Sequence, residues 1–270
     1  MKQKAFTLIE LLVVIAIVGI LSSVIYSNIT GIRDRARIMA GIRFDSSMLH
    51  SIGDQLVGEL LFDTNANPTP DTSGSGNNGT VYGATYATTS GYNDKGAYSF
   101  DGTNDYINVA NSASLNFDTG DFTIATWIKT STLADFRNLI YKGAGDGYSG
   151  WRFGLDNGVP HILIGDTTGF VSRTFGSVSI ANGIWHYLAI AYDRDSVVSA
   201  YVDGVLVGTV NIYTKTGSVN NSASLIIGLS YARYNGLLDN IRFYSSALSA
   251  SDIQNLYAEG VVLHPNLANK

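Results

Sequence analysis

The sequence predicts a mainly β protein, in which a long N-terminal α-helix over residues 6–62 precedes an antiparallel β-sandwich or jelly roll over residues 79–260. Three observations predict it. An apolar run fills the chain from residue 6 to 29, short segments after residue 80 alternate apolar and polar residues, and the composition has 29 Gly and 16 Tyr against 4 Pro. Many tight turns between short aromatic-rich strands are typical of sandwiches and jelly rolls.

Composition and charge exclude several kinds of protein. Of the 270 residues 14% are charged, whereas about 25% is usual in soluble domains. The net charge of -5 arises mainly after residue 78, and a mildly acidic, unclustered surface argues against nucleic-acid binding. The chain has 0 Cys, so disulfides and thiolate chemistry are impossible, although exported proteins do not require disulfides.

The N-terminal segment predicts a membrane-inserting helix. As a helix, residues 6–29 would extend roughly 36 Å, enough to cross a hydrocarbon core of about 30 Å. Glu10 lies inside this run, where a carboxylate costs roughly 2.5–3.5 kcal/mol, so we expect it to have a partner. A secretory signal peptide would place its small-residue cleavage site after the apolar run, whereas Ala5 precedes it.

These residues resemble a known processing signal. Lys-Ala-Phe-Thr-Leu-Ile-Glu-Leu at 4–11, followed by the apolar residues 13–21, is similar to the leader and N-terminal helix of bacterial type IV pilins and pseudopilins. The resemblance implies that a prepilin peptidase removes residues 1–5 between Ala5 and Phe6 and that Phe6 becomes N-methylated. It also implies that Glu10 pairs with the α-amino group of Phe6 in a neighbouring subunit, which agrees with the lower cost of burying two opposite charges together.

Two positions depart from the pilin pattern. Ala5 stands where the family usually has Gly, and Ser27 and Asn28 stand where many pilins have a helix-kinking Pro. A kink is therefore not established. The flanking charges alone do not orient the segment, because basic residues lie on both sides of it, whereas the resemblance places the N-terminus in the cytoplasm.

A helical stripe and then a polar stretch follow the apolar run. The stripe recurs at spacings of three, four or seven and consists of Ile38, Ile42, Leu49, Ile52, Leu56 and Leu60. It would pack on the protein's own head or on neighbouring filament helices. Residues 63–78 are rich in Pro, Gly and Ser, which indicates a flexible linker.

The remaining chain predicts short strands joined by turns. Asp203-Gly204 separates two apolar strands and is a strong hairpin signal. Ser249 with Asp252 three residues later predicts the start of a short last helix, before a C-terminal tail at 261–270.

Several motifs in this part resemble the laminin G-like branch of the concanavalin A-like lectin/glucanase superfamily. They are Phe-Asp-Gly-Thr-Asn-Asp-Tyr-Ile at 100–107, Phe-Thr-Ile at 122–124 with Trp-Ile-Lys at 127–129, Trp-His-Tyr at 185–187, Tyr-Val-Asp-Gly at 201–204 and Gly-Leu-Leu-Asp-Asn-Ile-Arg-Phe-Tyr at 236–244. The resemblance covers nearly all of residues 79–260 and implies a laminin G-like antiparallel β-sandwich.

Catalysis is not expected from these residues. Glucanases on this fold use paired carboxylates, yet the only glutamates are Glu10, Glu59 and Glu259, and none lies on a predicted head strand. The four histidines are scattered without metal-ligand spacing.

Two binding sites are expected instead. The resemblance implies Ca²⁺ between the early and late motifs, and Ca²⁺ prefers oxygen ligands; the candidates are Asp101, Asn104, Asp105 and Asp239, which otherwise cap turns. Loop aromatics could instead bind glycans or pack in the core, and the candidates are Tyr141, Tyr148 and Trp151.

The sequence thus favours a pilin-like structural subunit that assembles with other pilin subunits and displays a laminin G-like head. The alternatives are a minor pilin adhesin that binds glycans or surface proteins, and an envelope-tethered glycoside-active enzyme. The precursor would reside in the cytoplasmic membrane, and the mature protein in an extracellular pilus or in a periplasmic or cell-wall pseudopilus. The sequence leaves open whether the filament is a pilus, a secretion pseudopilus or a DNA-uptake fibre.

Overall fold

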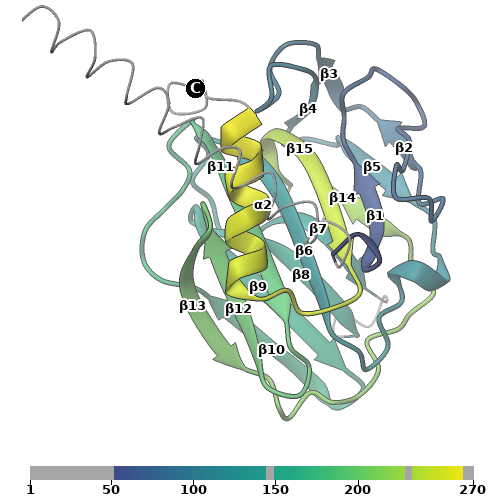
Figure 1. Ribbon diagram of the computed structural model, residues 1–270, viewed down its shortest axis with the longest axis vertical. Coiled ribbons are helices and arrows are strands. Elements are labelled where there is room, and N and C mark those ends of the chain that lie inside the picture. The colour runs from purple at the N-terminus through teal and green to yellow at the C-terminus, as the bar shows by residue number, and fades with distance from the viewer. Residues whose placement is uncertain (1–51, 144–148, 229–232, 264–270) are drawn as a thin grey trace, which may run out of the picture. The chain divides into compact units, whose positions relative to one another are not determined.

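The computed structural model describes residues 52–143, 149–228 and 233–263 (Figure 1). The chain divides into two units, Met1–His50 and Ser51–Lys270. The cleavage site, Glu10 and most of the predicted N-terminal helix therefore lie outside the described residues. Among the residues that are described, no helix combines the length and apolar character needed to span a membrane.

The second unit contains two antiparallel sheets packed as a sandwich, which confirms the predicted fold (Figure 1). Sheet A has the order β13-β12-β11-β6-β15-β4-β3, with β1 also paired to β15. Its strands are β1 (Leu56–Leu60), β3 (Thr85–Ala87), β4 (Ala97–Asp101), β6 (Phe122–Lys129), β11 (Trp185–Tyr192), β12 (Val197–Val202), β13 (Val205–Asn211) and β15 (Asn235–Tyr244).

Sheet B has the order β10-β9-β8-β7-β14-β5-β2. Its strands are β2 (Gly79–Tyr82), β5 (Tyr106–Val109), β7 (Arg137–Gly143), β8 (Gly150–Asp156), β9 (Val159–Asp166), β10 (Gly169–Thr174) and β14 (Leu225–Ile227). A 3₁₀ turn, η1 (Ala113–Leu115), follows β5, and α2 (Ala250–Leu263) follows β15.

Alternate residues of the two sheets face each other and form the core, as the period-two pattern predicts. Aromatic rings fill its centre. Phe122 stacks on Phe117 with ring centroids 4.4 Å apart and on Tyr192 at 4.2 Å. Trp151 lies beside them, 5.7 Å from the Phe122 ring.

Residues 56–60 are a strand, so the helix predicted as far as residue 62 is wrong at this end. β1 pairs antiparallel with β15, with Leu56 opposite Tyr244 and Leu60 opposite Ile241. Apolar residues four apart fit a strand as well as a helix, because four is a multiple of two. Pairing with β15 decides between them, since β4 covers the same edge of β15 only along its first half.

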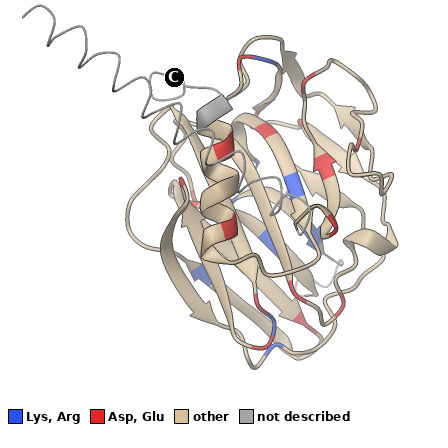
Figure 2. Cartoon of the chain, viewed as in Figure 1, with Lys and Arg blue, Asp and Glu red and all other residues tan. Residues whose placement is uncertain are grey.

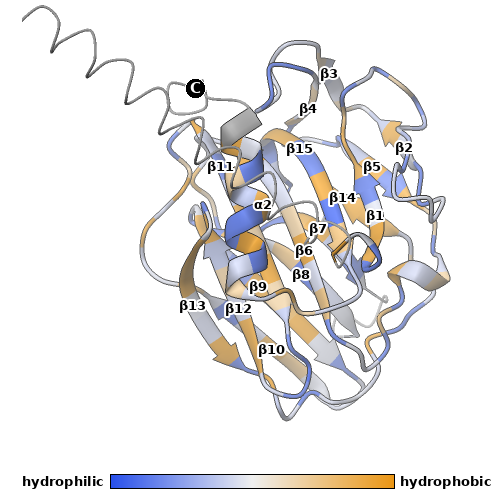
Figure 3. Ribbon diagram, in the orientation of Figure 1, coloured by the Kyte–Doolittle hydropathy of each residue, from blue (hydrophilic) through white to orange (hydrophobic). Residues whose placement is uncertain are grey.

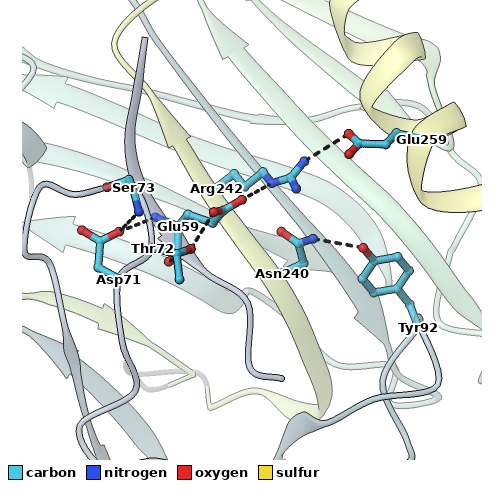
Figure 4. Close-up of polar contacts among 8 residues, drawn as sticks. All are labelled: Glu59, Asp71, Thr72, Ser73, Tyr92, Asn240, Arg242 and Glu259. Atoms are coloured by element: carbon cyan, nitrogen blue, oxygen red, sulfur yellow. Dashed lines mark hydrogen bonds and ion pairs between the residues drawn. The ribbon is translucent and has the colours of Figure 1, made fainter. Parts of the chain in front are cut away.

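The predicted flexible linker at residues 63–78 is held against the sheets. The Asp71 carboxylate accepts hydrogen bonds from the backbone amides of Glu59 at 2.8 Å and Ser73 at 3.0 Å (Figure 4). It also accepts one from the Asn77 amide at 2.8 Å. The Asn77 side chain in turn donates to the Val57 carbonyl at 2.7 Å. The Pro, Gly and Ser residues indicate the turns of this segment correctly. They do not indicate that the segment is fixed, because the hydrogen bonds of Asp71 hold it in place.

The two local turn predictions are confirmed. Asp203 and Gly204 both have positive φ, 50° and 75°, as a two-residue hairpin between β12 and β13 requires. Before α2, Ser249 Oγ accepts from the Asp252 amide at 3.2 Å and the Asp252 carboxylate accepts from the Ser249 amide at 2.9 Å, which completes a capping box.

Helix α2 lies across the outer face of sheet A (Figure 1). It carries both polar and apolar residues along its length (Figure 3), and Ile253 and Leu256 are buried. Tyr257 lies near Trp127 of β6, with ring centroids 5.9 Å apart. Lys and Arg residues are scattered among Asp and Glu in the view of Figure 2, so no single basic stripe marks that view.

Candidate functional site

Glu59 and Glu259 flank one arginine and form an ion-paired cluster (Figure 4). Arg242 Nε lies 2.9 Å from Glu59 Oε1, and Arg242 Nη1 lies 3.7 Å from Glu259 Oε2. Burial lowers the pKa of Arg242, but Tyr244 and the two carboxylates raise it by more, so the pKa stays above its usual range. Both glutamates therefore form ion pairs with an arginine that links β1, β15 and α2.

Asp239 is a buried carboxylate on β15 that has too few partners. It is 0% exposed, and its Oδ2 accepts a hydrogen bond from the Tyr92 amide at 3.1 Å. Within the described part of the chain, Asp239 Oδ1 and the neighbouring Asn240 Oδ1 have no hydrogen-bond partner. Burial raises the pKa of Asp239 well above its usual range, although the amides of Tyr92 and Asn240 act against it.

Oxygen atoms converge on the same place from the loop that covers Asp239. A Cβ atom added to Gly91 would lie 2.5 Å from the Gly96 carbonyl oxygen, 2.7 Å from Asp239 Oδ2 and 2.9 Å from Asn93 Oδ1. Only glycine fits here, because the three oxygens pack closely on its backbone. The position that they surround lies one covalent bond from Gly91 Cα, so no ion can occupy it, and the described residues contain no group of three or more His, Asp or Glu suited to a metal.

The other three predicted calcium ligands lie elsewhere. Asp105 Oδ2 accepts from the Asp101 amide at 2.8 Å, so these two residues brace the turn after β4, and Asn104 is exposed beside them. Asp101 lies opposite Asn235 in the sheet, and Asp239 is four residues further along β15, roughly 13 Å away. The structure therefore does not bring all four to one point.

The predicted glycan-binding aromatics are also separated. Trp151 is 1% exposed and packs in the core, so its assignment to a recognition loop is wrong. It lies on β8, where alternation turns its ring inward. Tyr141 lies on β7 opposite Arg152, and Tyr148 lies outside the described residues.

Sequence reasoning missed a cluster on the outer face of sheet B, formed by Phe136, His161 and Ser172. The ring centroids of Phe136 and His161 are 4.9 Å apart, and His161 Nε2 lies 3.1 Å from Ser172 Oγ. The hairpin of β9 and β10 brings His161 beside Ser172, and the loop before β7 adds Phe136. No short sequence motif indicates this cluster. The available signal was an aromatic residue, Phe136, in a polar loop.

Comparison with known proteins agrees with both parts of the chain. The model of the concanavalin A-like lectin/glucanases superfamily matches residues 101–254, and that of the prokaryotic N-terminal methylation motif matches residues 1–26. A region of adhesion G-protein coupled receptor V1 from Danio rerio is 26% identical over 148 residues, which are 51% of this chain but 2% of that receptor. The chain thus spans a very small part of this curated relative.

Solved structures share the sandwich. The binding domain of Paraclostridial mosquitocidal protein 1 is 21% identical, with 77% of this chain and 53% of that chain covered and a TM-score of 0.65. The binding domain of botulinum neurotoxin serotype D is 19% identical, with 79% and 53% covered and a TM-score of 0.63.

A third structure is covered almost completely. Domain 4 of AbnA, an extracellular GH43 arabinanase from Geobacillus stearothermophilus in complex with arabinotriose, is 22% identical, with 75% of this chain and 98% of that chain covered and a TM-score of 0.58. At these identities the three structures show a common fold. The chain belongs to the concanavalin A-like lectin/glucanase superfamily and begins with a prokaryotic N-terminal methylation motif.

Proposed function

We propose that this protein is a type IV pilin-like structural subunit that assembles through its N-terminal helix and displays the lectin-like sandwich. The observation that carries the proposal is the methylation motif at residues 1–26 in the same chain as the sandwich domain. A peptidase would cut after Ala5, and Phe6 would then offer an α-amino group to Glu10 of the next subunit. Each buried charge would thereby gain the opposite charge that makes its burial tolerable.

The first strand of the sandwich is firmly held, as attachment to an N-terminal assembly helix would require. Ile52 is buried, and β1 begins four residues later and pairs inside sheet A. Arg242 then ties β1 to β15 through Glu59, and to α2 through Glu259 (Figure 4). The chain therefore enters the head through a paired strand.

Mass spectrometry of sheared surface filaments tests the proposal. We expect an abundant peptide that begins at N-methyl-Phe6. In a Glu10→Ala strain we expect the processed chain to remain in the membrane fraction, because assembly would leave the neighbouring α-amino group unpaired. Intact Met1, together with the absence of the chain from any filament fraction, would refute the proposal.

A minor adhesive subunit is the second candidate function. It is favoured by the near-complete coverage of the arabinanase domain, which was solved with arabinotriose. Abundance separates the two candidates, since a tip adhesin would appear as the same N-methyl-Phe6 peptide in trace amounts. A tethered glycoside-active enzyme has less support, because Glu59 and Glu259 are both engaged by Arg242.

Calcium binding is proposed at the Asp239 site. Asp239 Oδ1 and Asn240 Oδ1 would offer oxygen ligands to the ion, because within the described part of the chain neither atom has a hydrogen-bond partner. The ion would supply the positive charge that the buried carboxylate lacks and would hold the loop over residues 91–96 against β15. This assignment keeps Asp239 from the predicted ligands and replaces Asp101, Asn104 and Asp105.

A further inference from the structure

Phe136 is an exposed aromatic residue in a strained backbone conformation. Its φ is +43°, a region that bulky residues rarely adopt, and its side chain is 51% exposed. The Asn157 amide donates to the Ala134 carbonyl at 3.1 Å, and the Asn157 side chain donates to Asp135 Oδ1 at 2.9 Å, so the loop is fixed to the β8–β9 turn. Strain that a fold maintains for an exposed apolar ring points to a function for the ring.

A directed chain of hydrogen bonds lies beside this ring. Thr174 Oγ1 donates to Asp156 Oδ2 at 3.1 Å, which leaves the Thr174 oxygen to accept from His161 Nδ1 at 2.9 Å. His161 Nε2 is then the acceptor for the Ser172 hydroxyl at 3.1 Å. Burial lowers the pKa of His161, with Asp156 acting against it, so the imidazole stays uncharged near neutral pH.

These groups share the outer face of sheet B. Val171 packs against the core, so alternation directs its neighbours Phe170 and Ser172 outward from β10. Phe170 is 45% exposed, and Phe136 lies at the other end of the strip, beside His161. The outward side chains of β10 span about 13 Å, the length of a short oligomeric ligand.

The chemistry of this strip fits a carbohydrate. Aromatic faces carry partial negative charge and attract the slightly positive C–H groups of a sugar ring. The exposed Ser172 hydroxyl, fixed in direction by His161, can pair with a sugar hydroxyl. The charged residues that flank the strip balance, because Asp135 and Asp156 are matched by two arginines, Arg137 next to Phe136 and Arg173 next to Ser172. The strip therefore offers no net charge to an ionic ligand, which suits a neutral sugar.

We propose that the Phe136–His161–Ser172 face binds a neutral oligosaccharide, with Phe136 as the stacking platform. The inference extends the proposed binding role of the head and does not depend on filament assembly. It assigns recognition to residues other than Tyr141, Tyr148 and Trp151.

The test uses the full chain in detergent micelles and isothermal titration calorimetry. The probes are arabinotriose, cellotriose and galactotriose, with 3′-sialyllactose as the anionic counterpart. The key variant is Phe136→Gly, which removes the ring and also relieves the positive φ, so that its melting temperature should be unchanged or higher. Phe136→Trp should preserve the platform, and Tyr82→Ala is the matched control because Tyr82 is 46% exposed on β2, at the opposite edge of sheet B from β10.

We expect at least one neutral trisaccharide to bind, with affinity reduced tenfold or more in Phe136→Gly and several-fold in Ser172→Ala. Affinity should be retained in Phe136→Trp and Tyr82→Ala. Failure of all three neutral probes to bind, binding of 3′-sialyllactose alone, or full affinity in Phe136→Gly would each overturn the inference. Processing at Phe6 would be unaffected by any of these results, so the pilin-like proposal is tested separately.

Discussion

Replacing Glu59 by Gln tests whether Arg242 fastens the strand through which the chain enters the head. Glu59 and Arg242 are 15% and 18% exposed, and their atoms are 2.9 Å apart. Removing one partner of a buried ion pair costs about 3–5 kcal/mol, whereas an exposed pair contributes about 0–1 kcal/mol. Because both side chains keep slight solvent contact and Glu259 remains nearby, we expect Glu59→Gln to lower the free energy of unfolding by about 2–3 kcal/mol.

Glu259→Gln is the matched control, since the same carboxylate-to-amide change is made 3.7 Å from the same guanidinium. A longer contact to a more exposed side chain should contribute about 1 kcal/mol or less. For a head of this size, the expected loss in Glu59→Gln corresponds to a melting temperature lowered by roughly 4–12 °C.

The assay is thermal unfolding of the full chain in detergent, followed by tryptophan fluorescence. All 3 Trp residues lie on strands of the sandwich, at Trp127, Trp151 and Trp185, so the signal reports the head alone. An effect of Glu59→Gln equal to or smaller than that of Glu259→Gln would refute the reasoning, because the short contact to β1 would then not be the one that matters.

Three further predictions concern two buried ionisable side chains and one helix cap. Without calcium, the raised pKa of Asp239 means that stability falls as the pH rises through that pKa. Calcium at a hundredfold excess over its Kd should add about 2.7 kcal/mol to the free energy of unfolding of the wild type and nothing to that of Asp239→Asn. Equal melting temperatures with calcium and with EDTA would contradict this prediction. Burial lowers the pKa of Lys142 to about 8 from 10.5, so the unfolded chain binds the proton between these values, and stability should rise by about 2 kcal/mol over that range. Urea unfolding at pH 7.5 and pH 10 should show this rise in the free energy of unfolding of the wild type but not of Lys142→Met. An equal rise in both proteins would exclude Lys142 as its source. Ser249→Ala removes the N-cap of α2 and should lower stability by about 1 kcal/mol, measured in the same urea assay, with exposed Ser177→Ala as the unaffected control.

Local rules predicted the parts of the fold whose cause lies within a few residues. The Asp203-Gly204 hairpin depends on two residues that tolerate positive φ, and the α2 capping box on two side chains three positions apart. β1 escaped prediction because the spacing of Leu56 and Leu60 satisfies both periods. The deciding partner, β15, is distant in the chain, since Glu59 and its contact Arg242 are 183 positions apart.

The candidate site likewise combines a residue that a local motif indicates with contacts that depend on distant parts of the chain. Asp239 was recognised as a candidate ligand by its residue type and motif, but its companions depend on where the loop over residues 91–96 folds. That loop is fixed by stacking of Tyr92 on Trp127, with ring centroids 4.5 Å apart, a contact that no local pattern encodes. Trp151 was misassigned because glycines around it suggested a loop, whereas alternation along β8 turns it into the core.

The two outer faces of the sandwich differ in what covers them. Sheet A receives β1 and α2, the first strand and last helix described, and Arg242 on β15 contacts both (Figure 4). Its outer face is further occupied by the Tyr92 loop, whose ring stacks on Trp127. Sheet B instead presents Phe136 and Phe170 to solvent. If the head acts as proposed, residues on the outer face of sheet B can change without altering the contacts of β1 and α2 with sheet A, because the two sets of residues lie on different sheets.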